Sequence, residues 1–579
     1  INWMLSRRPT LKSPLYEDIS ELQPIIIPRG SDSACMDNVF EFLIQSGYSL
    51  PHAMMMMVPE AWEQNPEMTP EKQAFYEYHE HLMESWDGPA SLTFTNGVQI
   101  GATLDRNGLR PSRYVVTKDD LVIMGSEVGA VEIPPENIKF KGRLQPGKMF
   151  LVDTKEGRII DDTELKANIC AAQPYSKWLK ENMLELSDLP KPDQVPETDF
   201  ESLLLRQKIF AYTTEDINLL LTPMVTNGVE ASGSMGDDTP LAVLSDKPRL
   251  LYDYFKQIFA QVSNPPIDSI REELVMSLTS RVGFERNILD PGANHAKMLK
   301  LFHPILSNEE LAKIKALDKQ DFRSKTLSML FDAASGVEGF SRALKELCEE
   351  AESAVNSGIT FVVLSDRGAS KDKVPIPALL AVGAVHHYLT LKRVRYKTGI
   401  IVETGEAREI THFCLLVSYG AGAINPYLAI ETIEQIIQQK ELPEELTLEK
   451  ANQNYCKAIR KGMYKVFSKM GISTIQSYRG AQIFEAIGLD EELIQDYFTG
   501  TPSRISGVGI REIAQASLLR HETALEKTPE TREILSGGGL YHWRRNGEFH
   551  QINPVMTNTL QRAVRKNSQD AYNEFSRLV

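Results

Sequence analysis

A polar turn near the start of the chain places hydroxyl and carboxylate groups beside an expected helix. Gly30-Ser31-Asp32-Ser33-Ala34 leads into a helix that should begin near Met36. Ser and Asp side chains accept hydrogen bonds from the free N–H groups of a first helical turn. From the residues alone, the turn is therefore interpreted as a helix cap.

A second candidate lies at the end of a strand. The run GITFVVL at 358–364 predicts a strand buried on both faces, and Ser365, Asp366 and Arg367 follow it directly. Open α/β sheets bind ligands at the carboxyl ends of their strands. A structural Asp366–Arg367 ion pair is nevertheless favoured over a catalytic one.

Other reactive side chains point to structural roles. Asp105, Arg106 and Arg110 flank an Asn107-Gly108 turn and are expected to form ion pairs at a sheet edge. His386 and His387 are adjacent, so on a helix they diverge by about 100° and cannot share one metal ion. The cysteines show no metal-ligand spacing, which favours buried free thiols and a reducing compartment such as the cytoplasm or a plastid. The sequence predicts no metal ligand.

The elements that position these groups change character along the chain. Residues 91–94 and 98–100 flank an Asn96-Gly97 turn and predict a hairpin in an antiparallel sheet over 1–170. A helix is expected from Thr69 to Trp86. The Pro-rich run from Leu189 to Pro196 is typical of a linker.

Beyond that run, helical patterns alternate with β-branched segments and predict an α/β domain over about 205–500. A helix is expected from Pro377 to about Arg393, with Leu380, Ala384 and Leu391 on one face. The glycines at 507–509 and 537–539 complete no nucleotide-binding fingerprint and are interpreted as hinges.

Size and charge exclude several classes of protein. The chain has 579 residues, enough for several domains, and its net charge of −15 argues against nucleic acid or an anionic membrane as partner. Small metabolites and other proteins fit better. The first residues are not those of a start or a signal peptide, so the chain is expected to begin within a domain.

Several runs together resemble one family. The turn at 30–34, NWM at 2–4 and LDRNGLRP at 104–111 resemble class II glutamine amidotransferases. GSMGDDTPL at 233–241, ETGEARE at 403–409 and YGAGAINPY at 419–427 are similar to the central domain of glutamate synthases, and KMGISTIQSYRGAQ at 469–482 to its exit toward a flavin domain. The chain is identified as a segment of a glutamate synthase large subunit.

The resemblance implies a fold and a division into domains. It implies part of an αββα N-terminal-nucleophile glutaminase sandwich over 1–188, followed by a linker over 189–204. An α/β central domain resembling a degenerate barrel would occupy 205–500, and an FMN-binding synthase domain would begin at 501–579. The family's N-terminal Cys nucleophile and Asn-Gly oxyanion hole are expected upstream of Ile1, because Cys35 is internal and has no free amine.

The resemblance also implies site residues. Asp32 would accept hydrogen bonds from the α-ammonium of glutamine. Positions near an ammonia channel or an interdomain contact would be Gly233, Ser234, Gly236, Asp366 and Arg367. The segment by itself is expected to be colourless and inactive.

Activity and partners follow from the same resemblance. The complete enzyme would make two glutamates from glutamine and 2-oxoglutarate, using FMN and a [3Fe–4S] cluster whose ligands are expected mostly outside this segment. Electrons would come from NAD(P)H, which the segment at 405–409 favours, or from ferredoxin. The flavoprotein partner would be a small subunit or a fused domain, and the assembly an oligomer. Two rivals remain: a scaffold without activity of its own, and a class II amidotransferase that feeds another acceptor.

Overall fold

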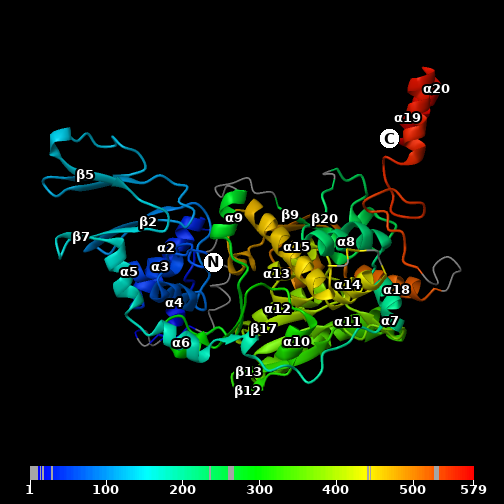
Figure 1. Cartoon of the computed structure of the whole chain (residues 1–579), viewed down its shortest axis with the longest axis horizontal. Helices are drawn as coiled ribbons and strands as arrows, with labels where there is room; N and C mark the ends of the chain where they lie inside the picture. The colour runs from blue at the N-terminus through cyan, green and yellow to red at the C-terminus, as the bar shows by residue number, and fades with distance from the viewer. Residues whose placement is uncertain are drawn as a thin grey trace.

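The computed structural model describes residues 11–13, 15, 18–27, 30–233, 236–258, 267–439, 442–443, 445–526 and 534–579. We divide it into an N-terminal region (residues 11–182), a central region (184–526) and a C-terminal segment (534–579). In Figure 1 the N-terminal region lies to one side of the larger central region, and the C-terminal helices project from the far end. Among the described residues, no helix has the length and apolar character needed to cross a membrane.

The N-terminal region has a helical layer and two antiparallel sheets. Its helices are α2 (Asp32–Gln45), α3 (Leu50–Met57), α4 (Pro70–His79), α5 (Asp162–Cys170) and α6 (Tyr175–Asn182). One sheet has the order β1 (Ser91–Thr95), β2 (Gln99–Leu104), β6 (Met149–Asp153), β7 (Arg158–Ile160), and the other the order β4 (Val122–Gly125), β3 (Arg113–Thr117), β5 (Ile138–Arg143).

Alternation along the strands explains this layering. Phe94 and Leu151 belong to the core that the helices form, whereas Ala102, Leu104 and Phe150 belong to a cluster with Met124 of the second sheet. The result is a helical layer followed by two sheets. This confirms a partial αββα sandwich; the described part of the region shows no second helical layer.

Local signals located the starts of elements better than their ends. The hairpin of β1 and β2 is confirmed, with Asn96 accepting the N–H groups of Val98 and Gln99. Thr69 caps α4 as expected. The expected end at Trp86 is wrong, because the helix stops at His79 and the chain turns so that the Trp86 N–H bonds to the Met57 carbonyl.

The central region contains a mainly parallel sheet. Its order is β12 (Asp318–Lys319), β13 (Phe322–Ser328), β15 (Phe361–Ser365), β17 (Gly399–Glu403), β18 (Ala421–Asn425), and β12 alone runs antiparallel to its neighbour. Because successive parallel strands are adjacent, the arrangement resembles one side of a barrel. No barrel closes within the residues that the structure describes, so the α/β prediction is confirmed as an open sheet.

Helices and smaller sheets surround this sheet. The helices of the central region are α7 (Phe200–Ile209), α8 (Thr222–Asn227), α9 (Ser269–Val275), α10 (Asn308–Lys315), α11 (Gly336–Asn356), α12 (Ala378–Leu391), α13 (Ile410–Ser418), α14 (Tyr427–Gln439), α15 (Leu448–Lys469), α16 (Ile475–Tyr478), α17 (Glu491–Tyr497) and α18 (Ile510–Leu525). The smaller sheets have the orders β10 (Ser280–Gly283), β11 (Met298–Leu301), β8 (Leu184–Glu185); β14 (Leu330–Asp332), β16 (Lys373–Pro375); and β20 (Ser503–Val508), β19 (Phe484–Leu489), β9 (Phe255–Gln257). The C-terminal segment contains α19 (Pro554–Lys566) and α20 (Gln569–Leu578).

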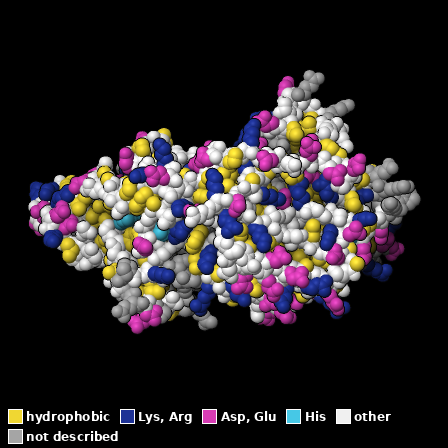
Figure 2. All heavy atoms as spheres, turned by 90° about the horizontal axis from the view of Figure 1, so that it is seen from below, with side chains coloured by type: hydrophobic (Ala, Val, Ile, Leu, Met, Phe, Trp, Pro, Cys, Tyr) yellow, Lys and Arg dark blue, Asp and Glu magenta, His cyan; other side chains and the backbone are white. Residues whose placement is uncertain are grey.

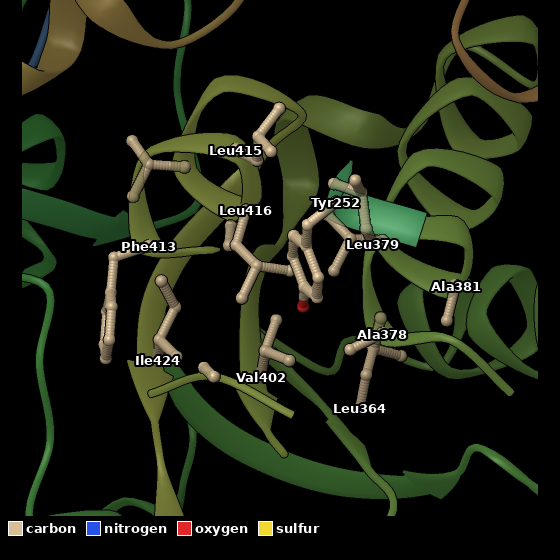
Figure 3. Packing of buried hydrophobic residues seen from close by; sticks show 14 of the residues in the cluster. Tyr252, Leu364, Ala378, Leu379, Ala381, Val402, Phe413, Leu415, Leu416 and Ile424 are labelled. Atoms are coloured by element: carbon tan, nitrogen blue, oxygen red, sulfur yellow. The ribbon is translucent and has the colours of Figure 1, made fainter. Parts of the chain in front are cut away.

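The two faces of the parallel sheet bury different residues. Leu364, Val402 and Ile424 pack with Leu379 of α12 and with Tyr252, as Figure 3 shows. The opposite face buries Phe361, Val363, Ile401 and Ala423 against α10 and β11. Burial on both faces explains why these strands are continuous apolar runs in the sequence.

Two expectations about this region need correction. Leu391 is 81% exposed rather than on the buried face of α12, because it is the last residue of the helix. The glycines at 507–509 are no hinge, since a Cβ at Gly507 would lie 2.2 Å from the Gly488 carbonyl oxygen between paired strands. Leu189, the first residue of the expected linker, is buried in the core beneath the sheet.

Truncating the buried face of β15 should destabilise the central region strongly. Phe361 is fully buried, so Phe361→Ala leaves a cavity and is expected to lower the free energy of unfolding by about 3–5 kcal/mol. Urea denaturation measures this change. Leu391→Ala, at an exposed position, is the control and should stay within about 0.5 kcal/mol of wild type. Equal effects of the two substitutions would contradict the assigned layers.

Candidate functional site

The N-cap of α2 is formed by Ser31 and not by its neighbour Asp32. Ser31 is the N-cap residue of α2, and its Oγ accepts the Ala34 N–H at 3.3 Å. Asp32 is the first residue of the helix and its side chain is exposed. Acidic residues are common in the first turn of a helix, where the helix dipole has its positive end. The cap interpretation therefore holds for Ser31, and Asp32 remains available to bind a cationic group. NWM at 2–4 lies outside the described residues.

Hydrogen bonds, rather than ion pairs, stabilise the turn at 104–111. Asp105 is buried and accepts the N–H groups of Ala90 and Asn107 at 3.0 and 2.8 Å. Arg106 donates to Ser85 Oγ at 3.1 Å and to the Val275 carbonyl at 3.4 Å. The expected ion pairs at the sheet edge are therefore wrong: the carboxylate shapes the turn, and the guanidinium reaches into the central region.

The N-terminal and central regions share a core. Ile288, Leu289 and Ala296, from the central region, belong to the apolar cluster of the N-terminal helices. The hydroxyls of Tyr48 and Tyr78 donate to carbonyls of the same segment, at 2.6 Å to Ile288 and at 2.9 Å to Gly292. Packing of this kind fixes the two regions relative to each other.

Buried charges cross the same interface. Arg281 of β10 is 2% exposed and pairs with Glu80, while Lys300 of β11 pairs with Glu77. Glu63 accepts hydrogen bonds from Ser277 Oγ at 2.7 Å. Removing one member of a buried ion pair leaves an uncompensated charge, so each pair resists separation of the regions.

A cavity of about 120 Å³ lies at the junction of the two regions. Its wall combines residues of the N-terminal region with residues of the central region: Gly88, Pro89, Asn107, Leu109, Ile267, Asp268, Arg271 and Gly471. The Asn107-Gly108 turn thus borders a space between the regions. The cavity exceeds the volume of a single water molecule.

The carboxyl ends of the parallel strands carry a row of polar side chains. Ser365, Glu403 and Asn425 occupy paired register positions of β15, β17 and β18 and are almost fully buried. Glu403 accepts hydrogen bonds from Lys315 Nζ at 2.5 Å and from Arg367 Nε at 2.8 Å. Burial raises the pKa of Glu403, but Lys315 and Arg367 lower it more strongly, and its pKa lies below the ordinary value.

The ion pairs continue beyond Glu403. Arg367 also donates to Glu431 at 2.9 Å and lies 4.1 Å from the ring centroid of Tyr427, and Glu431 pairs in turn with Arg206 of α7. We call Lys315, Glu403, Arg367, Glu431 and Arg206 the ion chain. It links α10, two strand ends, α14 and α7.

Asp366 does not pair with Arg367. Its carboxylate accepts hydrogen bonds from Thr404 Oγ1 at 2.6 Å and from the Gly405 N–H at 2.9 Å, so the expected ion pair is wrong. Consecutive side chains at a strand end point in different directions, so Asp366 bonds to residues just beyond β17, whereas Arg367 pairs with Glu403 and Glu431. Burial raises the pKa of Asp366 to about 8, although the bonds from Thr404 and Gly405 lower it.

The loop at 233–241 contacts the C-terminal segment. A Cβ added at Gly233 meets no atom within 4 Å, so no close backbone approach occurs there. Ser234 lies outside the described residues, and Gly236 makes a contact within the structure. Asp238 accepts the Ile552 N–H at 2.8 Å, which joins this loop to the C-terminal segment.

His386, a candidate metal ligand by residue type, has a structural role. His386 accepts a hydrogen bond from Arg395 Nε at 3.0 Å, and burial lowers its pKa. The described residues contain no cluster of His, Cys, Asp or Glu suited to a metal ion. The sequence analysis missed the roles of Glu403 and Arg281. A charged residue ending the apolar run GIIVE was the available signal for Glu403; Arg281 gave none.

Comparisons with known proteins agree with this architecture. The family described as "Glutamine amidotransferases class-II" matches residues 1–178, and the "Glutamate synthase central domain" matches residues 205–490. The chain belongs to the glutamate synthase family. It is 46% identical over its full length to the glutamate synthase [NADPH] large chain of Bacillus subtilis (strain 168), and 44% identical to the glutamate synthase [NADH] of Schizosaccharomyces pombe.

Relatives named for another electron donor match similarly well. The ferredoxin-dependent glutamate synthase of Pyropia yezoensis is 42% identical over 595 residues. The chain spans 37%, 28% and 38% of the lengths of these three relatives. Among solved structures, the flavin-binding domain of baker's yeast flavocytochrome b2 aligns with 52% of this chain and 96% of its own, at 10% identity and a TM-score of 0.26, too distant for an inference.

The described residues fit neither an iron–sulfur cluster nor FMN, the two cofactors that the resemblance implies for the complete enzyme. An iron–sulfur cluster needs several thiolates together, whereas the cysteines here are separate and mostly buried. At the carboxyl ends of the strands, where an α/β sheet would hold a nucleotide, the ion chain occupies the space.

Replacing Asp366 should change how the stability of the central region depends on pH. The folded pKa of about 8 lies above the ordinary Asp value, so Asp366 favours the folded state at low pH and loses this contribution as pH rises toward 8. Asp366→Asn cannot ionise. Its stability relative to wild type should therefore rise between about pH 4 and pH 8 and level off above, as urea denaturation across this range would measure. A difference that is constant with pH would contradict the assignment.

Proposed function

We propose that the protein containing this chain is a glutamate synthase that makes two glutamates from glutamine and 2-oxoglutarate. In this proposal the amidotransferase domain releases ammonia from glutamine, and the ammonia reaches 2-oxoglutarate without entering bulk water. FMN and a [3Fe–4S] cluster would supply the reducing equivalents. The observation that carries the proposal is the direct packing of a class II amidotransferase region onto a glutamate synthase central domain.

The proposal divides the chain by role. Residues 1–188 would form the C-terminal part of the glutaminase domain and 205–500 the central domain, joined through 189–204. Residues 501–579 would begin the FMN-binding domain. Leu189 in the core supports a short, fixed connection rather than a flexible one.

Asp32 is proposed to bind the α-ammonium of glutamine. Two observations support this role: Ser31 already supplies the cap, and the carboxylate is exposed on the first turn of α2. A carboxylate is the group that an ammonium requires, because an ionised acceptor makes a stronger hydrogen bond than a neutral one.

The central region is proposed to hold the two active sites in register. The shared core and the buried Arg281–Glu80 pair support a rigid connection, and the cavity at the junction supports a protected route between the regions. This role needs no catalytic group from the central region, so the region serves as a scaffold within the enzyme.

For the electron donor we favour NAD(P)H over ferredoxin, on the segment at 405–409. Relatives named for each donor match this chain, and the two first ones are named for NADPH and NADH. The proposed partners are accordingly a flavoprotein small subunit or fused domain. Reduction assays of the full-length enzyme with NADPH, NADH and reduced ferredoxin would decide.

Replacing Asp32 in the full-length enzyme should weaken glutamine binding selectively. Asp32→Asn loses a charge-assisted hydrogen bond, so the KM for glutamine is expected to rise by roughly tenfold to a hundredfold. Glutamate formation from added ammonia should be unchanged. Asp37→Asn, on an exposed position of the same helix, is the matched control. An unchanged KM in Asp32→Asn would return this residue to a structural role.

The glycines at 233 and 236 test whether the loop borders the ammonia route. Because the surroundings of Gly233 are open, Gly233→Val should fold normally. If ammonia passes beside the loop, Gly233→Val or Gly236→Val should make glutamine hydrolysis exceed glutamate formation. The ratio of the two rates in the full-length enzyme is the measurement. One-to-one coupling in both variants would exclude this role.

A further inference from the structure

The glycine run that opens the C-terminal segment encloses a carboxylate of the central region. Consecutive backbone N–H groups of residues 539–542 donate to Glu215, which is 3% exposed. The N···O distances are 2.7 Å for Gly539, 2.9 Å for Leu540 and 3.3 Å for Tyr541, all to Oε2, and 3.2 Å for His542 to Oε1. This arrangement is an anion-binding nest.

The glycines are required for this geometry. Gly538 and Gly539 have φ values of +84° and +109°, in the region that side chains disfavour. A Cβ at Gly538 would lie 2.8 Å from Glu215 Oε2. The run 537–539 is therefore a turn held in place by its contacts with Glu215, and its interpretation as a hinge is wrong.

Two further polar contacts fasten the same segment. Asp238 accepts the Ile552 N–H and lies 2.8 Å from His550 Nδ1, whose Nε2 contacts the Gly539 carbonyl at 2.7 Å. Glu548 accepts hydrogen bonds from Ser245 Oγ at 2.7 Å and from Arg249 at 3.2 Å. Each contact joins the segment to a different part of the central region.

Polar rather than apolar contacts dominate this attachment. Glu548 and His550 are each 6% exposed, whereas Tyr541, Trp543 and Phe549 are 47%, 45% and 62% exposed. The anchors are thus the buried charged groups. Tyr541 OH also contacts Glu409 Oε2 at 3.3 Å, directly before α13.

We propose that Glu215 is a built-in ligand of the nest at 539–542 and that, with Asp238, it latches the C-terminal segment onto the central region. The latch determines the position from which α19 and α20 leave the body of the molecule (Figure 1). Without the carboxylate, the N–H groups of the nest lose their acceptor, and a buried unpaired donor is unfavourable. The nest must then open to water or accept another small anion.

Hydrogen–deuterium exchange of the 579-residue chain tests the latch. Glu215→Ala is expected to speed exchange of the amides at 539–542 by at least about tenfold, since the lost bonds are charge-assisted. Glu215→Gln, which keeps an acceptor oxygen, should give a smaller effect. Asp238→Asn should affect residues 550–552 more than 539–542. Glu164→Gln, at an exposed position of α5, is the matched control and should change none of these amides.

Chemical rescue identifies the nest as an anion site. Sodium acetate, compared with sodium chloride at equal ionic strength, should restore slow exchange at 539–542 in Glu215→Ala and leave Glu215→Gln unaffected. Unchanged exchange in Glu215→Ala would overturn the proposal. Faster exchange throughout β15 and β17 would overturn it too, because Glu215 would then support the whole fold rather than a local latch.

Discussion

Glu403 is an ionised group at the end of a strand that is buried on both faces, and its charge must be balanced within the protein. Lys315 and Arg367 provide that balance, and Arg367 in turn requires Glu431. Each partner comes from a different element, so neutralising one carboxylate fixes α10, the loop after β15 and α14 together. The same rule operates at the domain junction, where Arg281 and Lys300 meet Glu80 and Glu77. On the face of the molecule that Figure 2 shows, by contrast, exposed charges of both signs are interspersed.

Buried charges and apolar packing have different consequences for this architecture. The apolar faces of β15 and β17 stabilise the sheet without specifying one neighbour, because hydrophobic contact is not directional. Ion pairs require particular partners at short distances, and breaking one is strongly unfavourable. The ion chain therefore fixes elements within the central region, whereas the junction pairs and the latch at Glu215 determine how the three parts of the chain are arranged.

Sequence patterns predicted helix caps, turns and buried strands well, because each of these depends on residues that are adjacent in the sequence. The Thr69 cap, the Asn96-Gly97 turn and the apolar run of β15 each depend on neighbouring residues. The end of α4 and the partners of Asp366 depend on residues distant in the sequence, and no local pattern contains them. Asp32 was found through resemblance. Its separation from the cap became visible with the hydrogen bond of Ser31.

The energetics of the ion chain also determine what the carboxyl end of the sheet can do. A substrate carboxylate that bound Arg367 would displace Glu403 or Glu431, both about 1% exposed. Lys315 would still pair with Glu403 and Arg206 with Glu431, but each buried carboxylate has two cationic partners and one of the two carboxylates would lose one. Breaking a buried ion pair costs up to about 3–5 kcal/mol. Binding of a metabolite at millimolar to micromolar affinity provides only about 4–8 kcal/mol in total. Displacement would offset much of that free energy, so the ion chain disfavours binding of a carboxylate ligand to Arg367 and instead connects α10, α14 and α7.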